Sequence, residues 1–126
     1  MELKVLTYKR ILRKILEKVS SLIVILFLLF AVIFTNYLKK HDLKIMYIAS
    51  ESMEPTIKAH QFVIGQKIDP SELQIGDIAT YRDNMITITH RIIDKTENSF
   101  EFKGDNNPTS DGYINKGRVL YKIIKY

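Results

Sequence analysis

The chain has 126 residues, a net charge of +5 and no cysteine. If an N-terminal anchor takes about forty of these residues, the remainder forms one small domain near the lower size limit for a stable core. The lack of cysteine excludes a disulfide scaffold, a thiol nucleophile and a cysteine-ligated zinc site.

The positive charge is concentrated in front of an apolar segment. Six basic residues stand there: Lys4, Lys9, Arg10, Arg13, Lys14 and Lys18. This placement is typical of segments that contact anionic lipid headgroups and set membrane topology. The rest of the chain carries both signs interspersed, without interleaved basic and aromatic residues, so no nucleic-acid partner is expected.

The apolar segment is long enough to cross a membrane as a helix. Residues 22–34 are all apolar, and residues 19–38 form a twenty-residue segment whose ends include a few polar side chains, which are Ser20, Ser21, Thr35, Asn36 and Tyr37. A helix of about 20 residues rises about 30 Å, the thickness of a bilayer's hydrocarbon core. No small-x-small cleavage pattern follows, and residues 37–40 (Tyr-Leu-Lys-Lys) end the run like an interfacial anchor. We predict an uncleaved transmembrane helix over residues 19–38, the alternative being a buried core helix.

The flanking charges predict the orientation of this helix. Six Lys and Arg precede it, against three shortly after it, which are Lys39, Lys40 and Lys44. The positive-inside rule then places a basic segment, residues 1–18, in the cytoplasm and residues 39–126 across the cell membrane. Apolar residues at helical spacing within the basic segment either form an interfacial amphipathic helix or extend the anchor helix.

Beyond the anchor the pattern changes to short apolar runs separated by turn residues. Six strands are predicted, over residues 45–49, 62–67, 77–81, 86–93, 99–103 and 118–125. Residues 69–72 (Asp-Pro-Ser-Glu) carry helix start signals and predict one short helical turn. Residues 39–126 are therefore expected to be mainly β, a small, partly open barrel or sandwich behind the single helix.

The clearest strand, residues 86–93, places a histidine among apolar residues. Alternation puts Ile86, Ile88, His90 and Ile92 on one face of the strand. A histidine in such a row is either a core residue with satisfied polar atoms or a base that lines a pocket. The spacing alone favours the core interpretation.

A serine near the anchor has the surroundings of a nucleophile. Residues 50–55 (Ser-Glu-Ser-Met-Glu-Pro) begin about a dozen residues after the apolar segment, which would hold Ser52 near the bilayer surface. A serine hydroxyl needs a base, and His90 is the best candidate because an unperturbed histidine titrates at about pH 6.5. An acidic loop follows over residues 103–111. These three segments together indicate a membrane-bound serine peptidase.

Four short segments, taken in order, resemble the sequence boxes of type I signal peptidases. They are residues 50–56 (Ser-Glu-Ser-Met-Glu-Pro-Thr, the nucleophile box), 76–79 (Gly-Asp-Ile-Ala), 89–92 (Thr-His-Arg-Ile, the base box) and 104–107 (Gly-Asp-Asn-Asn) with Asp111. Order and spacing agree over residues 45–112. Histidine in the base box is similar to the ER-type branch, found in archaea, eukaryotes and some Gram-positive bacteria, whereas the common bacterial enzymes use lysine.

The resemblance implies a role for each of these residues. Ser52 would attack the scissile carbonyl, and His90 would accept its proton and later donate it to the leaving amine. Asp105 and Asp111 are both implicated in orienting the imidazole, with Asp111 favoured as its direct partner. For Asp105 the alternative is a structural turn, since Gly-Asp-Asn-Asn-Pro is ordinary turn chemistry. The Ser52 N–H and the Ser50 hydroxyl would form the oxyanion hole.

The implied substrates are exported preproteins whose signal peptides carry small residues at positions −1 and −3. An extended peptide can add to an exposed strand edge, and residues 45–49 and 62–67 are the candidate edges. The lipid bilayer is an expected partner, together with accessory proteins of the secretion machinery. No cofactor is expected, and no metal site, because no histidine pair or carboxylate cluster has ligand spacing.

Two other interpretations compete with this one. Self-cleaving repressors have a related peptidase core, but they use lysine as base and carry a DNA-binding domain where this chain has its apolar segment. A non-enzymatic membrane-anchored β module, or a pilin-like subunit, would not need Ser52, His90 and Asp111 to meet. Catalysis requires Ser52 Oγ and the His90 imidazole near hydrogen-bonding distance.

Overall fold

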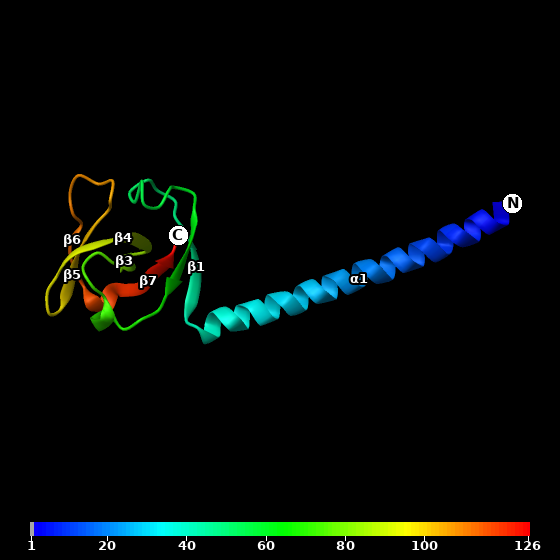
Figure 1. Cartoon of the computed structure of the whole chain (residues 1–126), viewed down its shortest axis with the longest axis horizontal. Coiled ribbons are helices and arrows are strands. Elements are labelled where there is room, and N and C mark those ends of the chain that lie inside the picture. Colours follow the sequence, from blue (N-terminus) through cyan, green and yellow to red (C-terminus); the bar gives the residue numbers. More distant parts are fainter. Residues whose placement is uncertain (1) are drawn as a thin grey trace. The chain divides into compact units, whose positions relative to one another are not determined.

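The computed structural model describes residues 2–126, with side chains from Leu6 onward. The chain divides after Leu38 into two compact units. Helix α1 (Glu2–Lys40) accounts for the first, and the second is built from β-strands (Figure 1).

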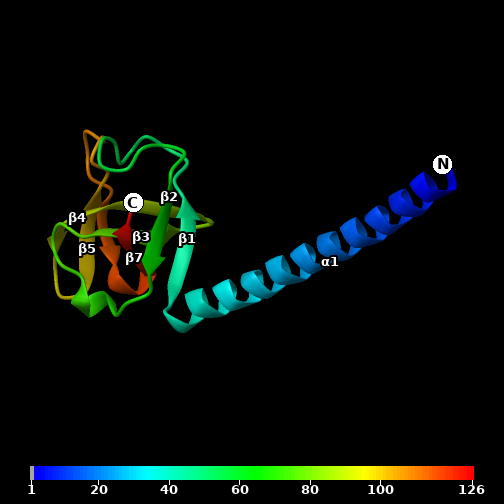
Figure 2. The same cartoon turned by 45° about the vertical axis from the view of Figure 1, so that its right-hand side comes forward.

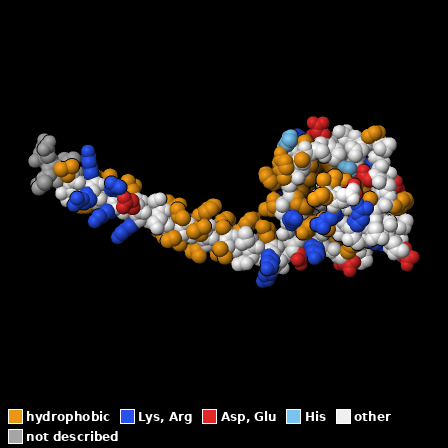
Figure 3. Space-filling model, turned by 180° about the vertical axis from the view of Figure 1, so that it is seen from behind, with side chains coloured by type: hydrophobic (Ala, Val, Ile, Leu, Met, Phe, Trp, Pro, Cys, Tyr) orange, Lys and Arg blue, Asp and Glu red, His pale blue; other side chains and the backbone are white. Residues whose placement is uncertain are grey.

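Helix α1 is continuous through the basic segment and the apolar segment. The predicted span of residues 19–38 lies inside it, and the residues before it extend the same helix. Large apolar side chains from Leu22 to Phe34 are 40–68% exposed on all sides of the helix, and basic side chains gather toward its N-terminal end (Figure 3). The Thr35 hydroxyl donates to the Ala31 carbonyl at 2.9 Å, so this polar group is satisfied without water. The helix is long and apolar enough to cross a membrane.

The second unit is a single antiparallel sheet of seven strands that curls into a half-barrel (Figure 2). The strands are β1 (Leu43–Tyr47), β2 (Phe62–Gln66), β3 (Ile78–Asp83), β4 (Ile86–Lys95), β5 (Ser99–Lys103), β6 (Gly112–Asn115) and β7 (Val119–Lys125). Their order is β1-β2-β7-β3-β4-β5-β6, so the C-terminal strand lies inside the sheet, between β2 and β3. The expected mainly β, partly open architecture is confirmed.

The predicted strands are all present within a few residues, and one further strand was missed. Strand β6 is only four residues long and directly follows Asp111, so its pattern was too short to stand out from the acidic loop. The short turn predicted at residues 69–72 is the 3₁₀ turn Pro70–Glu72, and Asp69 caps it by accepting from the Ser71 N–H at 2.8 Å.

Two clusters of buried side chains hold the sheet together. The first lies beneath the β1–β2 loop and consists of Ile48, Met53, Ile57, Val63, Ile78 and Ile123. The second lies along β3, β4 and β5 and consists of Leu73, Ala79, Tyr81, Ile92, Phe100 and Phe102. Burial of each large apolar side chain contributes about 1.5–3 kcal/mol relative to leaving it exposed. The first cluster therefore anchors the β1–β2 loop, and the second joins strands β3, β4 and β5.

Candidate active site

Ser52 lies in the β1–β2 loop, which two buried side chains attach to the sheet. Met53 and Ile57 are completely buried in the first core cluster. The Ile57 N–H donates to the Met53 carbonyl at 2.9 Å, and the Glu54 N–H donates to the Glu51 carbonyl at 3.1 Å, so the loop turns tightly. Because the side chain after Ser52 is held in the core, the Ser52 backbone has a defined position.

The β5–β6 loop docks directly on the backbone of the β1–β2 loop, and the two loops lie side by side in Figure 2. The Asn106 N–H donates to the Ser52 carbonyl at 2.9 Å, and the Asn106 side-chain amide donates to the Glu51 carbonyl at 3.2 Å. At Gly104 a Cβ would lie 2.6 Å from the Ser52 carbonyl oxygen. Only glycine allows this close approach, and the approach fixes where the Ser52 hydroxyl can point.

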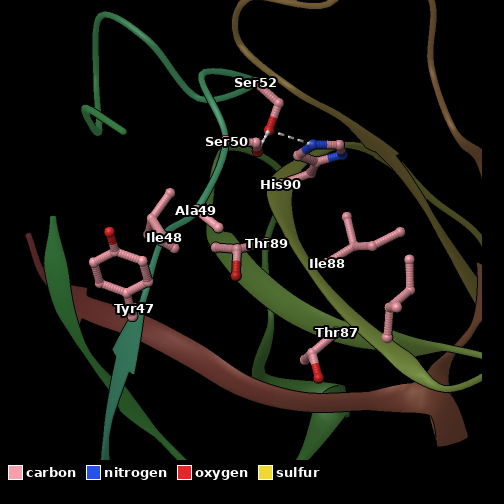
Figure 4. A pocket seen from close by; sticks show the side chains of 10 residues that line it. Tyr47, Ile48, Ala49, Ser50, Ser52, Thr87, Ile88, Thr89 and His90 are labelled. Carbon is pink, nitrogen blue, oxygen red and sulfur yellow. Dashed lines mark hydrogen bonds between the residues drawn. The ribbon is translucent and has the colours of Figure 1, made fainter. Parts of the chain in front are cut away.

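Ser52, His90 and Asp111 form a continuous line of hydrogen bonds. Ser52 Oγ lies 3.0 Å from His90 Nε2, and His90 Nδ1 lies 2.5 Å from Asp111 Oδ2. A carboxylate only accepts, so Nδ1 carries the proton and the Nε2 lone pair faces the Ser52 hydroxyl. Figure 4 shows the Ser52 side chain turned toward the His90 ring. The contact that catalysis requires is present, from segments 38 residues apart in the sequence.

The imidazole is the most deeply buried member of this line. The His90 side chain is 7% exposed and the Asp111 side chain 20% exposed. His90 occupies the apolar row of β4 that the alternation predicted, but its two ring nitrogens face Ser52 and Asp111. The Tyr81 hydroxyl also donates to Asp111 Oδ2, at 2.9 Å. Burial, reinforced by the bond to Asp111, raises the pKa of Tyr81 well above its ordinary value, so Tyr81 stays a donor.

Asp105 has a different partner. Its two carboxylate oxygens accept from Arg91 Nε at 2.8 Å and Arg91 Nη2 at 2.7 Å, and it makes no hydrogen bond to His90 in the described part of the chain. Arg91 also donates to the Gly76 carbonyl at 2.8 Å. The bidentate bond with Arg91 lowers the pKa of Asp105 below its ordinary range. Of the two predicted acids, the structure therefore brings only Asp111 to the imidazole.

Ser50 stands beside the nucleophile. Its Oγ lies 3.1 Å from Ser52 Oγ, and both face the same groove. Within residues 2–126, no atom accepts a hydrogen bond from the Ser52 N–H. One hydroxyl and one backbone N–H thus lie at Ser52 Oγ, and these are the two groups that the resemblance implies for an oxyanion hole.

A groove of about 380 Å³ leads away from the Ser52–His90 pair. One wall is residues 47–50, which continue β1, and the other is residues 86–90 of β4 (Figure 4). Strand β1 ends the sheet and has a free edge, and β4 pairs with β5 only from Arg91 onward. Both walls therefore present unpaired backbone to the groove.

One predicted edge is wrong. Strand β2 pairs with β1 along its whole length and with β7 at Ile64, Gly65 and Gln66, so β2 lies inside the sheet and is not an edge strand. Its place as the second free edge is taken by the first half of β4. The error arose because the order of strands depends on the return of β7 from the far end of the chain.

Four residues with defined roles at this site were not singled out from the sequence. Tyr81 bonds Asp111, Arg91 bonds Asp105, and Gly104 and Asn106 seat the Ser52 backbone. Gly104, Asn106 and Arg91 lie inside the quoted boxes, so their position was visible but their contacts were not. For Tyr81 the only signal is strand alternation, which places it on the same face of β3 as Ala79.

The chain matches no protein-family model and no curated protein sequence. Within the described residues, no three His, Asp or Glu side chains cluster as metal ligands would.

Proposed function

We propose that the chain is a membrane-bound serine endopeptidase that removes N-terminal signal peptides from exported preproteins. The observation that carries this proposal is the line from Ser52 Oγ through His90 to Asp111, with its 3.0 Å and 2.5 Å contacts. Hydroxyl, imidazole and carboxylate in this order are the parts of a serine-histidine-acid triad. The resemblance of the four sequence boxes to type I signal peptidases gives the substrate class.

In the proposed reaction, Ser52 Oγ bonds to the scissile carbonyl carbon while His90 Nε2 takes its proton. The same proton then passes to the amine nitrogen as the C–N bond breaks, which leaves an acyl ester on Ser52. Water attacks this ester, His90 takes a proton from the water, and the proton returns to Ser52 when the carboxylate product leaves. Asp111 accepts from Nδ1 throughout and favours the imidazolium that forms at each step.

The oxyanion of the tetrahedral intermediates would be held by the Ser52 N–H and the Ser50 hydroxyl. Preorganised donors at this position lower the barrier by about 3 kcal/mol each, because they act on charge that develops only during the reaction. In this role the Ser50 hydroxyl would turn from Ser52 Oγ toward the substrate oxygen.

The groove fits an extended peptide better than a compact ligand. A substrate strand between residues 47–50 and residues 86–90 would pair with backbone on both sides and close the gap in the half-barrel. Side chains then alternate between the groove floor and solvent, so that positions −1 and −3 face the same apolar surface, which includes Ile48 and Ala49. A shallow surface of this kind suits small residues.

The proposed location is the cell membrane, with α1 as a single-pass anchor. Six basic residues before the apolar segment favour a cytoplasmic N-terminus and a β domain on the opposite side. The β1–β2 loop follows the helix closely in sequence, so the nucleophile would work near the membrane surface, where signal-peptide cleavage sites emerge.

The test is cleavage by the full-length protein in lipid vesicles of a radiolabelled preprotein with an Ala-x-Ala site. We expect cleavage after the second alanine, and its loss in Ser52→Ala and His90→Ala. Ser71→Ala and His41→Ala are matched controls, because both residues are exposed and lie outside the site. These two variants should cleave at the wild-type rate.

A fluorophosphonate probe that esterifies activated serines adds a readout without a preprotein. Labelling of the wild type that Ser52→Ala abolishes would support an activated Ser52 even where a particular preprotein is not cleaved. Absence of both labelling and cleavage in a folded protein would contradict the proposal and favour a non-enzymatic membrane-anchored module.

A further inference from the structure

We propose that Tyr81 is a positioning residue of this site, whose hydroxyl holds the Asp111 carboxylate in place and takes a share of its charge. The inference rests on the proposed function, since it concerns the same triad. The Tyr81 hydroxyl and His90 Nδ1 bond the same oxygen, Asp111 Oδ2, at 2.9 Å and 2.5 Å. Because they share this acceptor, Tyr81 belongs to the line of hydrogen bonds, although it does not contact the substrate.

The sheet register brings Tyr81 to this position. Ala79 of β3 lies directly opposite His90 of β4, and Tyr81 is two residues further along the same face. The Tyr81 side chain therefore reaches across from the strand next to the base. Its ring packs against Phe102 with centroids 4.7 Å apart, and Tyr81 is 2% exposed. The hydroxyl is thus fixed by packing.

Asp111 needs such a support because its own attachment is limited. Its backbone N–H donates to the Phe102 carbonyl at 2.8 Å, which anchors the main chain but leaves the side chain free to rotate. The carboxylate is 20% exposed, so water can compete for its oxygens. A rigid donor aimed at Oδ2 restricts that rotation and holds the oxygen in front of Nδ1.

The second effect of the hydroxyl is electrostatic. Two donors on one oxygen divide its negative charge, so the imidazolium is held less strongly than it would be by Asp111 alone. The Asp105 carboxylate also lies near the imidazole, and its ion pair with Arg91 balances its charge. Without the Tyr81 hydroxyl, the whole charge of Asp111 Oδ2 would face His90 Nδ1, and the hydrogen bond between these two atoms would strengthen.

The experiment compares Tyr81→Phe with a matched control, Tyr113→Phe, in the full-length protein in lipid nanodiscs. Tyr113 donates its hydroxyl to Asp94 at 2.6 Å on the exposed side of β6, so the control loses the same kind of bond away from the site. We expect Tyr81→Phe to lower kcat by about tenfold, because the Asp111 side chain loses its rigid donor. Tyr113→Phe should match the wild type.

Replacement of Tyr81 by 3-fluorotyrosine gives a test of opposite sign. Fluorine makes the hydroxyl a stronger donor, so the hydrogen bond from His90 Nδ1 to Asp111 should weaken and the Nδ1 proton resonance should move upfield. A purely structural role predicts no change of this resonance in either replacement, because both keep the aromatic ring in the core. Values of kcat and Nδ1 resonances of both variants that match the wild type would overturn the proposal.

Proton NMR of ¹⁵N-histidine-labelled protein tests the same bond without turnover. The Nδ1 proton of His90, assigned by its loss in His90→Gln, should shift downfield in Tyr81→Phe and stay in place in Tyr113→Phe. This readout holds even where no preprotein is cleaved, so a failure of the proposed function is distinguishable. An unchanged Nδ1 resonance in Tyr81→Phe would overturn the role of Tyr81.

Discussion

At the scale of single residues, Ser50 and Ser52 combine the proposed nucleophile with a neighbouring donor in one short loop. The two Oγ atoms are 3.1 Å apart, and the imidazole of His90 is 3.0 Å from the second. A hydroxyl beside a nucleophile stabilises the bound substrate only weakly. It can donate a stronger hydrogen bond once negative charge develops on the carbonyl oxygen. Its contribution is therefore expected in the chemical step.

The first prediction concerns Ser50→Ala. We expect kcat for preprotein cleavage to fall by about 10²-fold with KM unchanged, because the lost donor acts only on the oxyanion. Steady-state kinetics beside Ser71→Ala would measure this. A rise in KM with kcat unchanged would mean that Ser50 contacts the substrate in its ground state.

The second prediction concerns the Asp105–Arg91 pair, whose side chains are 16% and 30% exposed. Arg91 lowers the folded-state pKa of Asp105, so the pair stabilises the fold above the unfolded pKa of about 3.9, and this contribution is lost as pH falls through the folded pKa. Asp105→Asn should lower the free energy of unfolding by about 1–2 kcal/mol at pH 7, after allowance for solvent screening.

Urea denaturation at pH 7 and at about pH 3 measures this difference. The difference in free energy of unfolding between the wild type and Asp105→Asn should be smaller at the lower pH. Asp94→Asn is the control, since Asp94 accepts from the neutral Tyr113 on the surface. If the difference in free energy of unfolding is the same at both pH values, the charge of Asp105 is not what stabilises the loop.

At the scale of elements, the two loops at one end of the sheet build the site together. The β1–β2 loop carries Ser52 and the β5–β6 loop carries Asp111, while β4, which lies between them in sequence, carries His90. Backbone hydrogen bonds join the two loops, such as the one from the Asn106 N–H to the Ser52 carbonyl at 2.9 Å. These bonds keep the side chains of Ser52, His90 and Asp111 at their mutual distances. The distance between Ser52 and Asp111 therefore depends on how closely these loops pack.

The third prediction tests this packing through Gly104→Ala. The new Cβ would lie 2.6 Å from the Ser52 carbonyl oxygen, and the obstacle is backbone, so the loops must separate. A shift of about 1 Å at the nucleophile can lower the rate by about 10²-fold. Gly117→Ala is a matched control, because its Cβ meets only the Asn115 side chain, at 3.2 Å.

Cleavage rates and thermal unfolding of both glycine variants would check the outcome. We expect a large loss of rate and a lower melting temperature in Gly104→Ala alone. A Gly104→Ala protein with wild-type activity would mean that the loops adjust without moving Ser52.

At the scale of the whole molecule, charge and hydropathy are segregated along the chain. Basic residues precede the apolar part of α1, and the β domain carries both signs. This segregation leads to the fourth prediction, on topology. Replacing Arg10, Arg13, Lys14 and Lys18 by glutamine leaves fewer basic residues before the span than after it, so a mixed or inverted orientation is expected.

Protease protection of the β domain in sealed vesicles would measure that orientation. The wild type should show one orientation, and the four-fold variant should show both. An unchanged single orientation in the variant would mean that other features of the chain set its topology.

The sequence predicted the parts of this protein whose signals are local. The span within α1, six of the seven strands and the apolar row containing His90 follow from hydrophobic periodicity, which neighbouring residues determine. Strand β6 was missed because four residues beside a turn carry too little pattern. The resemblance carried by the short boxes predicted in addition that Ser52 and His90 meet, although 38 residues separate them.

What the sequence could not determine is which local pieces meet. The free edges depend on β7, which enters the sheet between β2 and β3, and this overturned the prediction for residues 62–67. The choice between Asp105 and Asp111 depended on the path of one loop, because both carboxylates are within reach of β4. Residue type and periodicity determined the helix, the strands and the chemical groups of this protein. Long-range pairing decided their partners, since those contacts depend on the packing of distant segments.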